Sequence, residues 1–292
     1  MGEKMKKFFV ILILVFSLIL FSQGWQKSFD GSLILSFNNY SDNWDGKESS
    51  NLNWTANGNG LFSKDLYTFL NSTNKVKLSF GQSSTKIDTL WSDFFKSSDI
   101  INLESVERFL LNFLVDPFVS VRLESQFIDE SDTLKICYIN PLKFTEGLGV
   151  ARLIYKKEKL EISSRFGGAF KQSINRNAIK DSITLSRGID TRVDGGFEFV
   201  TEGFVPLREY ATYTFKLNLY KALFNSKEDQ LAGTPQQDYW KMVDVSFDNI
   251  VNIKIYEYIS VNFNFLMLYD KEIDSKVRMK EILGIGLTYK FL

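Results

Sequence analysis

The sequence has no histidine, a single cysteine and four prolines among its 292 residues. Without histidine, Ser-His-Asp and Cys-His catalytic sites and the usual catalytic zinc sites are excluded. Cys137 stands alone, so it cannot form a disulfide within the chain. Basic and acidic residues number 35 each, and this balance points to neither nucleic acid nor an acidic polymer as a partner. We therefore expect no enzyme activity, no cofactor and no metal site.

The only long apolar run lies at the start of the chain and has the features of a secretory signal peptide. Three lysines within residues 1–7 precede the apolar residues 8–21, and Ser22 and Gly24 supply the small residues expected before a cleavage point. The run is shorter than the ~20 apolar residues of a membrane-spanning helix, although an uncleaved anchor is the alternative interpretation. We predict a signal peptide at 1–24 and one exported domain at 25–292.

Alternation of apolar and polar residues dominates the rest of the sequence and predicts β-strands. For example, Val119, Val121 and Leu123 share one face of a strand whose other face carries Arg122 and Glu124. No segment shows a convincing helical period. The pattern indicates about twelve strands with boundaries uncertain by several residues. They lie near 31–40, 50–63, 74–86, 99–112, 117–128, 143–156, 159–173, 191–203, 208–224, 240–256, 258–271 and 276–292.

Connector lengths and strand lengths favour a membrane barrel. Tight turns alternate with longer connections such as 129–142, 174–190 and 225–239, although 63–73 is longer than this rule expects. Outer-membrane barrels have short turns at one rim and long loops at the other. Several of the strands exceed the ~9–11 residues that cross a bilayer. We therefore predict an all-β fold, a single transmembrane antiparallel β-barrel of about twelve strands, with outer-membrane lipid around it.

Charged residues on the polar faces of these strands are the candidate functional residues. Five of them are predicted to line the lumen: Arg122, Glu124, Arg165, Glu198 and Lys216. They could set charge selectivity for a permeating solute. Alternatively, they could form an interior ion-pair network that braces and blocks a narrow barrel. Glycine pairs near 147–149, 167–168 and 195–196 indicate either close approach of a ligand or, as we favour, bending of the wall.

Aromatic residues suggest contacts at the membrane surface. Trp91, Phe94 and Phe95 lie in a loop, where they could form a surface anchor or an inward-folded plug. A second group is predicted to belong to the aromatic girdles that border the apolar band of a barrel. Its members are Tyr239, Trp240, Tyr256, Tyr258, Tyr289 and Phe291.

Short motifs in the first half of the mature chain carry a further signal. An Asn-Trp pair at 43–44 ends the stretch WQKSFDGSLILSFNNYSDNW, and an Asn-rich second strand follows as LNWTANGNGLF. The pattern continues in VKLSFGQSSTKID, VRLESQF and INPLKFTEGLGVARLIYKKEKLEISSRFGGAF. In these motifs the chain resembles a family of uncharacterised outer-membrane β-barrel proteins, a domain of unknown function common in Bacteroidetes-type bacteria. The resemblance implies a cell outer-membrane location and a barrel, and it brings no known activity.

The last strand, GIGLTYKFL at 284–292, alternates to the end of the sequence. In a closed barrel it would pair with the first strand, around residues 33–37. Resemblance to bacterial outer-membrane barrels implies that Tyr289 and Phe291 form the signal read by the barrel assembly machinery. We expect a narrow porin-like channel or transporter for small polar solutes. The alternatives are a non-conducting structural or surface-interaction barrel and a secreted soluble β-sandwich that binds a ligand.

Overall fold

A computed structural model of the chain describes residues 24–38, 50–87, 90–111, 113–131, 135–181 and 186–291. The predicted signal peptide, apart from Gly24, and the Asn-Trp pair at 43–44 lie outside the described residues. The described part is almost entirely β-structure, with one four-residue helix and one short 3-10 helix. Among the described residues, no helix is long and apolar enough to cross a membrane.

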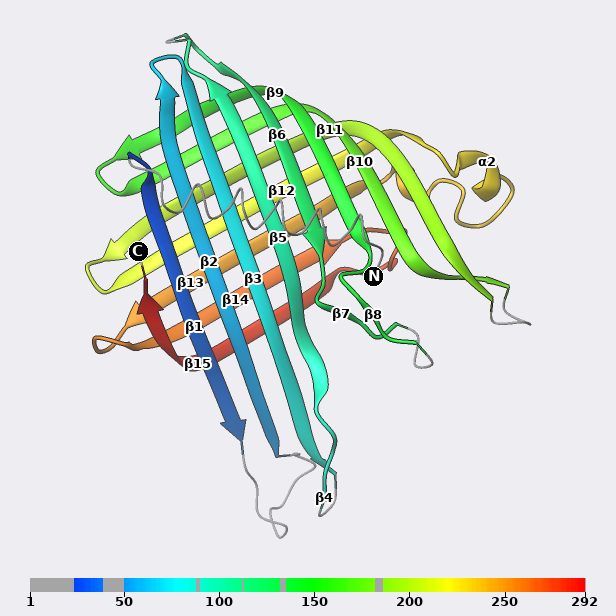
Figure 1. Cartoon of the computed structure of the whole chain (residues 1–292), viewed down its shortest axis with the longest axis horizontal. Coiled ribbons are helices and arrows are strands. Elements are labelled where there is room, and N and C mark those ends of the chain that lie inside the picture. The colour runs from blue at the N-terminus through cyan, green and yellow to red at the C-terminus, as the bar shows by residue number, and fades with distance from the viewer. Residues whose placement is uncertain are drawn as a thin grey trace.

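Twelve long antiparallel strands form one closed barrel (Figure 1). Each strand pairs with its neighbour in the sequence, and the wall closes where the first strand meets the last. The barrel strands are β1 (Gln26–Asn38), β2 (Asn51–Tyr67), β3 (Leu70–Ile87), β5 (Phe95–Phe109), β6 (Asp116–Ser125), β9 (Leu142–Lys157), β10 (Leu160–Asp181), β11 (Ser186–Arg208), β12 (Ala211–Asn225), β13 (Val243–Lys254), β14 (Ile259–Tyr269) and β15 (Arg278–Lys290). The smaller elements at the loops are β4 (Leu90–Trp91), β7 (Ile128–Asp129), β8 (Cys137–Tyr138), α2 (Glu228–Leu231) and η1 (Tyr239–Lys241).

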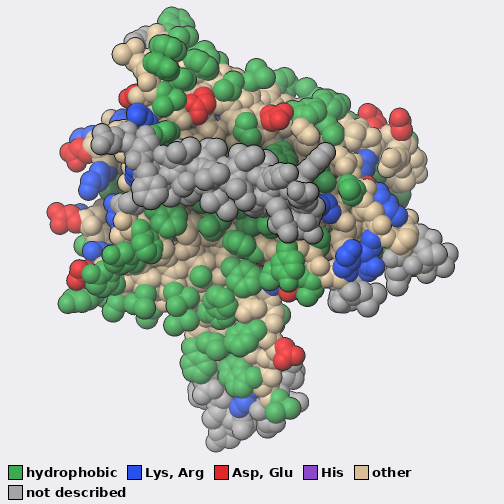
Figure 2. Space-filling view, viewed as in Figure 1, with side chains coloured by type: hydrophobic (Ala, Val, Ile, Leu, Met, Phe, Trp, Pro, Cys, Tyr) green, Lys and Arg blue, Asp and Glu red, His purple; other side chains and the backbone are tan. Residues whose placement is uncertain are grey.

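The outer face of the wall is apolar and the inner face is polar. Along β15, Ile285 and Leu287 are exposed on the outside, whereas Gly284 and Gly286 face inward and are buried. Hydrophobic side chains cover much of the wall visible in Figure 2, and charged side chains gather toward its two ends. This arrangement is that of a membrane-spanning barrel. It rules out the β-sandwich alternative, because one sheet closes on itself instead of two sheets packing face to face.

The seam between β1 and β15 confirms the predicted closure by the first and last strands. Leu33 pairs with Leu287 and Leu35 pairs with Ile285, within a register of six residue pairs from Asp30 to Leu35. Phe291 extends the seam, since its backbone N–H donates to the Phe29 carbonyl over 2.8 Å. The final strand is therefore not a free edge.

The short turns lie at one rim of the barrel, together with the start of β1 and the end of β15. The long connections lie at the other rim (Figure 1). Two predicted connectors were wrong. The turn expected at 63–73 is a tight one at Thr68 and Phe69, because β2 and β3 are longer than predicted. The long loop expected at 174–190 is mostly strand, because β10 and β11 continue beyond the region where an apolar outer row is required.

Candidate functional site

A network of charged side chains crosses the barrel lumen. Alternation along each strand sends these side chains inward and their apolar neighbours outward. The network consists of Lys75 and Lys77 on β3, Glu104 on β5, Arg122 and Glu124 on β6, Arg165 on β10, Glu198 and Glu202 on β11, Lys216 on β12 and Asp248 on β13.

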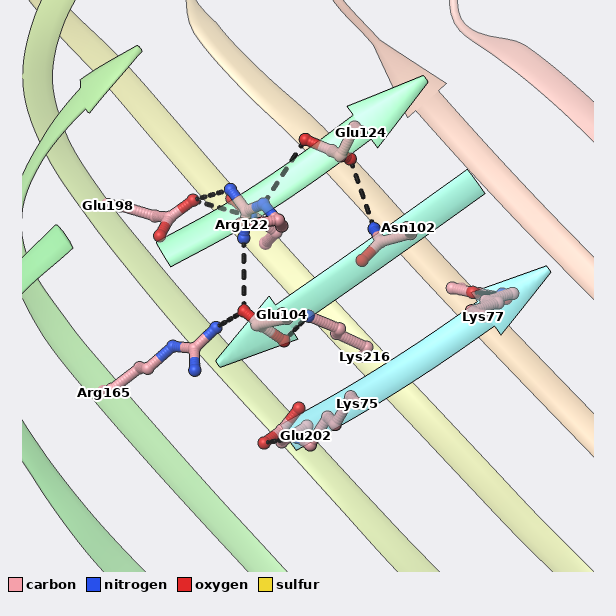
Figure 3. A network of polar contacts seen from close by, with 12 residues as sticks. Lys75, Lys77, Asn102, Glu104, Arg122, Glu124, Arg165, Glu198, Glu202 and Lys216 are labelled. Carbon is pink, nitrogen blue, oxygen red and sulfur yellow. Dashed lines mark hydrogen bonds and ion pairs between the residues drawn. The ribbon is translucent and has the colours of Figure 1, made fainter. Parts of the chain in front are cut away.

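Glu104 lies at the centre of this network (Figure 3). Its carboxylate accepts a hydrogen bond from Lys216 Nζ at 2.7 Å and lies 3.6 Å from Arg122 Nη1. Arg165 Nη2 also donates to it. The Glu104 side chain is only 1% exposed, so its charge is removed from bulk water. Such a buried carboxylate is tolerated because opposite charges surround it.

Arg122 connects Glu104 to two further carboxylates. Its Nη2 donates to Glu198 Oε1, and its Nε lies 3.3 Å from Glu124 Oε2. Asn218 Nδ2 donates to the same Glu198 oxygen over 2.8 Å. The guanidinium group therefore joins three strands, β5, β6 and β11, through charge-assisted contacts.

Three ion pairs join walls that lie nearly opposite each other. Lys75 on β3 pairs with Glu202 on β11, and Lys77 pairs with Asp248 on β13. On the shorter way around the wall, four strands separate β3 from β11 and four separate β3 from β13. Four strands also lie between β5 and β12, which the pair of Glu104 and Lys216 connects. Side chains thus bridge the lumen directly.

The network is electrically balanced and only partly dry. Its five cations, Lys75, Lys77, Arg122, Arg165 and Lys216, match its five carboxylates, Glu104, Glu124, Glu198, Glu202 and Asp248. The two pairs formed from β3 keep side-chain exposures between 24% and 34%. Burial is therefore greatest around Glu104 and Arg122, whereas the two pairs formed from β3, together with Glu124 and Lys216, stay partly exposed.

All five predicted lumen residues lie in this network, on four different strands. Five members of the network were not predicted from the sequence: Lys75, Lys77, Glu104, Glu202 and Asp248. Lys75 and Lys77 could have been found, since they alternate with Val76 and Leu78. Glu104 carried a weaker signal, because Ser105 interrupts the apolar row of its strand. No group of three or more acidic, histidine or cysteine side chains in the described part of the chain is placed to hold a metal ion.

Gly149 and Gly167 support close packing of neighbouring wall strands and not an approach by a ligand. A side chain on Gly149 would meet the backbone oxygen of Phe166, and one on Gly167 would meet that of Leu148. The space that a Cβ would occupy is filled by the backbone of the neighbouring strand. These positions of β9 and β10 need glycine because the strands approach closely there.

The aromatic residues fall into three places. Trp91, Phe94 and Phe95 are exposed, and Trp91 stacks on Phe37 with ring centroids 6.4 Å apart, so they form no plug in the lumen. Tyr239 and Trp240 lie in the loop that follows β12, where Tyr239 lines a cavity and Trp240 is buried against Ala169 and Tyr220 of the wall, so the assignment of Trp240 to a girdle was wrong. The remaining girdle candidates at the short-turn rim are exposed on the outer face: Tyr256, Tyr258, Tyr289 and Phe291.

No known protein-family profile matches the chain, and no curated protein matches it. The resemblance to an uncharacterised Bacteroidetes-type family therefore has no support from these comparisons. An outer membrane channel from Pseudomonas putida F1 is 16% identical, with 90% of this chain and 94% of that chain covered and a TM-score of 0.42. The translocator domain of the autotransporter NalP from Neisseria meningitidis is 10% identical, with 99% of this chain and 96% of that chain covered and a TM-score of 0.39.

A mutant porin from Rh. blastica is 7% identical, with 91% of this chain and 100% of that chain covered and a TM-score of 0.25. At these identities and scores, the matches assign no function. The fold follows from the chain's own geometry, which is a closed twelve-strand barrel with an apolar outer wall and a charged lumen.

Proposed function

We propose that the chain is a bacterial outer-membrane barrel that passes small polar solutes through a narrow, ion-pair-lined lumen. The observation that carries this proposal is the partial exposure of the pairs Lys75–Glu202 and Lys77–Asp248 inside the wall. A lumen closed by packing alone would leave these side chains dry. Their access to solvent supports a water-containing path beside the buried part of the network.

The same contacts limit what the path can carry. Side chains bridge nearly opposite walls, so the free width is far below that of the water-filled lumen of 16-stranded porins. Cations and carboxylates are balanced along the path, so strong selectivity for ions of one sign is not expected. The narrow width and the balanced charges of the path favour slow passage of small, uncharged or weakly charged solutes.

A second candidate function is a barrel that does not conduct. The observation that favours it is the burial of Glu104, Arg122, Arg165 and Glu198, whose side chains are at most 8% exposed. Such a cluster would brace the wall and leave function to the loops. In either case we propose that outer-membrane lipid surrounds the wall and that the barrel assembly machinery inserts it.

Two measurements on the full chain distinguish these functions. Recovery in the outer-membrane fraction, released only by detergent, is expected for both barrel functions; release without detergent would contradict them. The purified barrel is then placed in planar bilayers and in liposomes loaded for swelling assays. We expect small conductance steps and swelling with small solutes that falls off steeply with solute size. A folded barrel that gives neither conductance nor swelling would favour the bracing function.

A further inference from the structure

A polar cavity lies at the rim that carries the long loops, above the lumenal network. Its volume is about 320 Å³, at the lower end of the sizes of small-molecule sites. The wall strands β10, β11 and β12 form one side of it, and the loops after β12 and β14 form the other. Leu231 and Tyr239 supply apolar surface, and Asn225, Arg192 and Glu272 supply polar groups.

The formal charges in this cavity cancel one another. Arg192 pairs with Glu272, and Lys227 pairs with Asp190. Burial raises the pKa of the Glu272 carboxyl above its ordinary 4.5, and nearby Asp270 adds to this rise against the opposing effect of Arg192. An additional anion would therefore be disfavoured, and a cation would have to compete with partners already in place.

Two buried polar atoms of the residues around this cavity lack a hydrogen-bond partner, and both are donors. Asn225 is 5% exposed, and its Oδ1 accepts the backbone N–H of Lys227 at 2.9 Å. Its Nδ2 has no hydrogen-bond partner among the described residues, and neither has the buried Nε of Arg192. Both residues line the cavity, but neither donor atom has accessible surface of its own, so both side chains must turn toward the cavity to meet a ligand. Because buried donors without partners cost free energy, these two groups favour a ligand that brings acceptor oxygens.

We propose that this cavity binds one neutral, polyhydroxylated solute of about monosaccharide size. Hydroxyl oxygens would accept from Asn225 Nδ2 and Arg192 Nε, and the C–H surface of the solute would lie against Leu231 and Tyr239. The ligand is neutral because the charges of the cavity are already paired. This inference deepens the proposed function, since it names the class of solute that enters the lumen, and the binding itself is measured independently of passage.

The test is isothermal titration calorimetry on the detergent-purified full chain. The neutral probes are D-glucose, D-galactose and D-mannose, and the charged analogues are D-gluconate and D-glucosamine. We expect at least one neutral hexose to bind with a Kd of about 1 mM or tighter and the charged analogues to bind at least about tenfold more weakly. Absence of binding by all three hexoses, or tighter binding of a charged analogue, would overturn the inference.

Variants locate the binding. Asn225→Leu removes the unmet amide donor and is expected to weaken hexose binding about tenfold. Asn177→Leu is the matched control, because Asn177 is also 5% exposed but lies outside the cavity lining. If Asn225→Leu does not fold, Arg192→Lys keeps the charge opposite Glu272, removes the Nε donor and is expected to weaken binding by a similar factor. Equal binding by wild type and by these cavity variants would overturn the location.

Binding and passage are separate readouts. Hexose binding without conductance or swelling would keep the cavity as a ligand site and contradict the channel. Conductance or swelling without hexose binding would keep the channel and contradict the cavity assignment.

Discussion

Glu104 is the residue on which the lumenal network depends most, because three cations, Arg122, Arg165 and Lys216, converge on its carboxylate. Neutralising it leaves these cations in a poorly hydrated place without their main counter-charge. Breaking a buried ion pair by removal of one partner typically costs about 3–5 kcal/mol. We expect Glu104→Gln to lower the free energy of unfolding by roughly this amount, as measured by urea unfolding of the liposome-inserted barrel.

Glu124→Gln is the matched control for this prediction. Glu124 also pairs with Arg122, but its side chain is 41% exposed. An exposed ion pair contributes about 0–1 kcal/mol, so this variant should unfold within that range of the wild type. Similar unfolding curves for the two variants would show that burial of the Glu104 charge does not affect the free energy of unfolding.

At the residue scale, one half of this network is predicted from the sequence and the other half is not. Arg122 and Glu124 stand out because clean apolar rows flank them, and the same alternation identifies Lys216. Glu104 does not stand out, since polar Ser105 and Glu107 occupy the opposite row. Which charges meet across the lumen depends on the register and the order of the strands around the wall, and neither is encoded in the alternation of a single strand.

Among the elements, the small hairpin of β7 and β8 is held by a buried polar contact outside the membrane wall. Asp129 accepts hydrogen bonds from Asn140 Nδ2 at 2.6 Å and from the Ser131 backbone at 3.1 Å. Burial alone would raise the pKa of Asp129, but these hydrogen bonds outweigh it and lower the pKa below its ordinary 3.8. A carboxyl with a lowered pKa in the folded state stabilises above 3.8 and loses that contribution as the pH falls through its folded pKa.

We therefore expect a pH-dependent difference between the wild type and Asp129→Asn. At about pH 5.5, amide hydrogen exchange in peptides containing Ile128 and Tyr138 should be slower in the wild type, because the charged carboxylate holds the hairpin. At a pH below the folded pKa of Asp129 the two proteins should exchange alike, since the carboxyl is then neutral. Comparison at equal pH cancels the intrinsic exchange rates. A constant difference at both pH values would contradict the role of this charge.

The closing strand is the second element with a testable contribution. Phe291 lies 5.7 Å from the Phe29 ring and 4.8 Å from the Tyr289 ring, on the outer face of the seam. Aromatic pairs contribute about 0.5–1.5 kcal/mol each beyond area burial. We expect Phe291→Ala to lower the free energy of unfolding by roughly 1–2 kcal/mol and to reduce the folded fraction on a heat-modifiability gel.

Leu283→Ala is the control for the seam, because Leu283 is an exposed outer-face residue of the same strand and pairs with Phe263 of β14 instead of with β1. If Phe291 also contributes to recognition by the assembly machinery, Phe291→Ala should lower the folded fraction more in cells than after refolding from urea. Equal folded fractions for Phe291→Ala and the wild type, in cells and in vitro, would contradict both contributions.

The sequence predicted elements well wherever one face of a strand meets lipid. The twelve strands and the closure of β15 on β1 follow from an alternation that the bilayer enforces. The same reasoning failed at residues 174–190, where β10 and β11 continue past the apolar band. There Asn175, Arg176 and Asn177 follow one another without an apolar row. Hydrogen bonds between the two strands maintain the structure in that region, and they leave no period-2 signature.

At the scale of the whole molecule, we expect the partly exposed pairs formed by Lys75 and Lys77 to govern the electrostatics of the path proposed above. Replacing both lysines with methionine leaves Glu202 and Asp248, whose side chains are 24% and 26% exposed in the wild type, without these partners. These carboxylates would then attract cations into the path. The loss of two bridges between nearly opposite walls should also widen it. We expect larger conductance steps than in the wild type and a reversal potential shifted toward the cation in a KCl gradient.

The double variant Lys156→Met and Lys159→Met is the control, because it also removes two positive charges but does so at exposed positions beside the β9–β10 turn. Its conductance and reversal potential should match the wild type, since charges at the rim are screened by salt. A net-charge effect would shift both variants alike, whereas control by the lumenal pairs shifts only the variant of Lys75 and Lys77. Unchanged selectivity in that variant would mean that ions do not pass these pairs, and silence in all three proteins would favour the bracing function. The experiment therefore tests whether the cross-lumen ion pairs line a path or only hold two walls together.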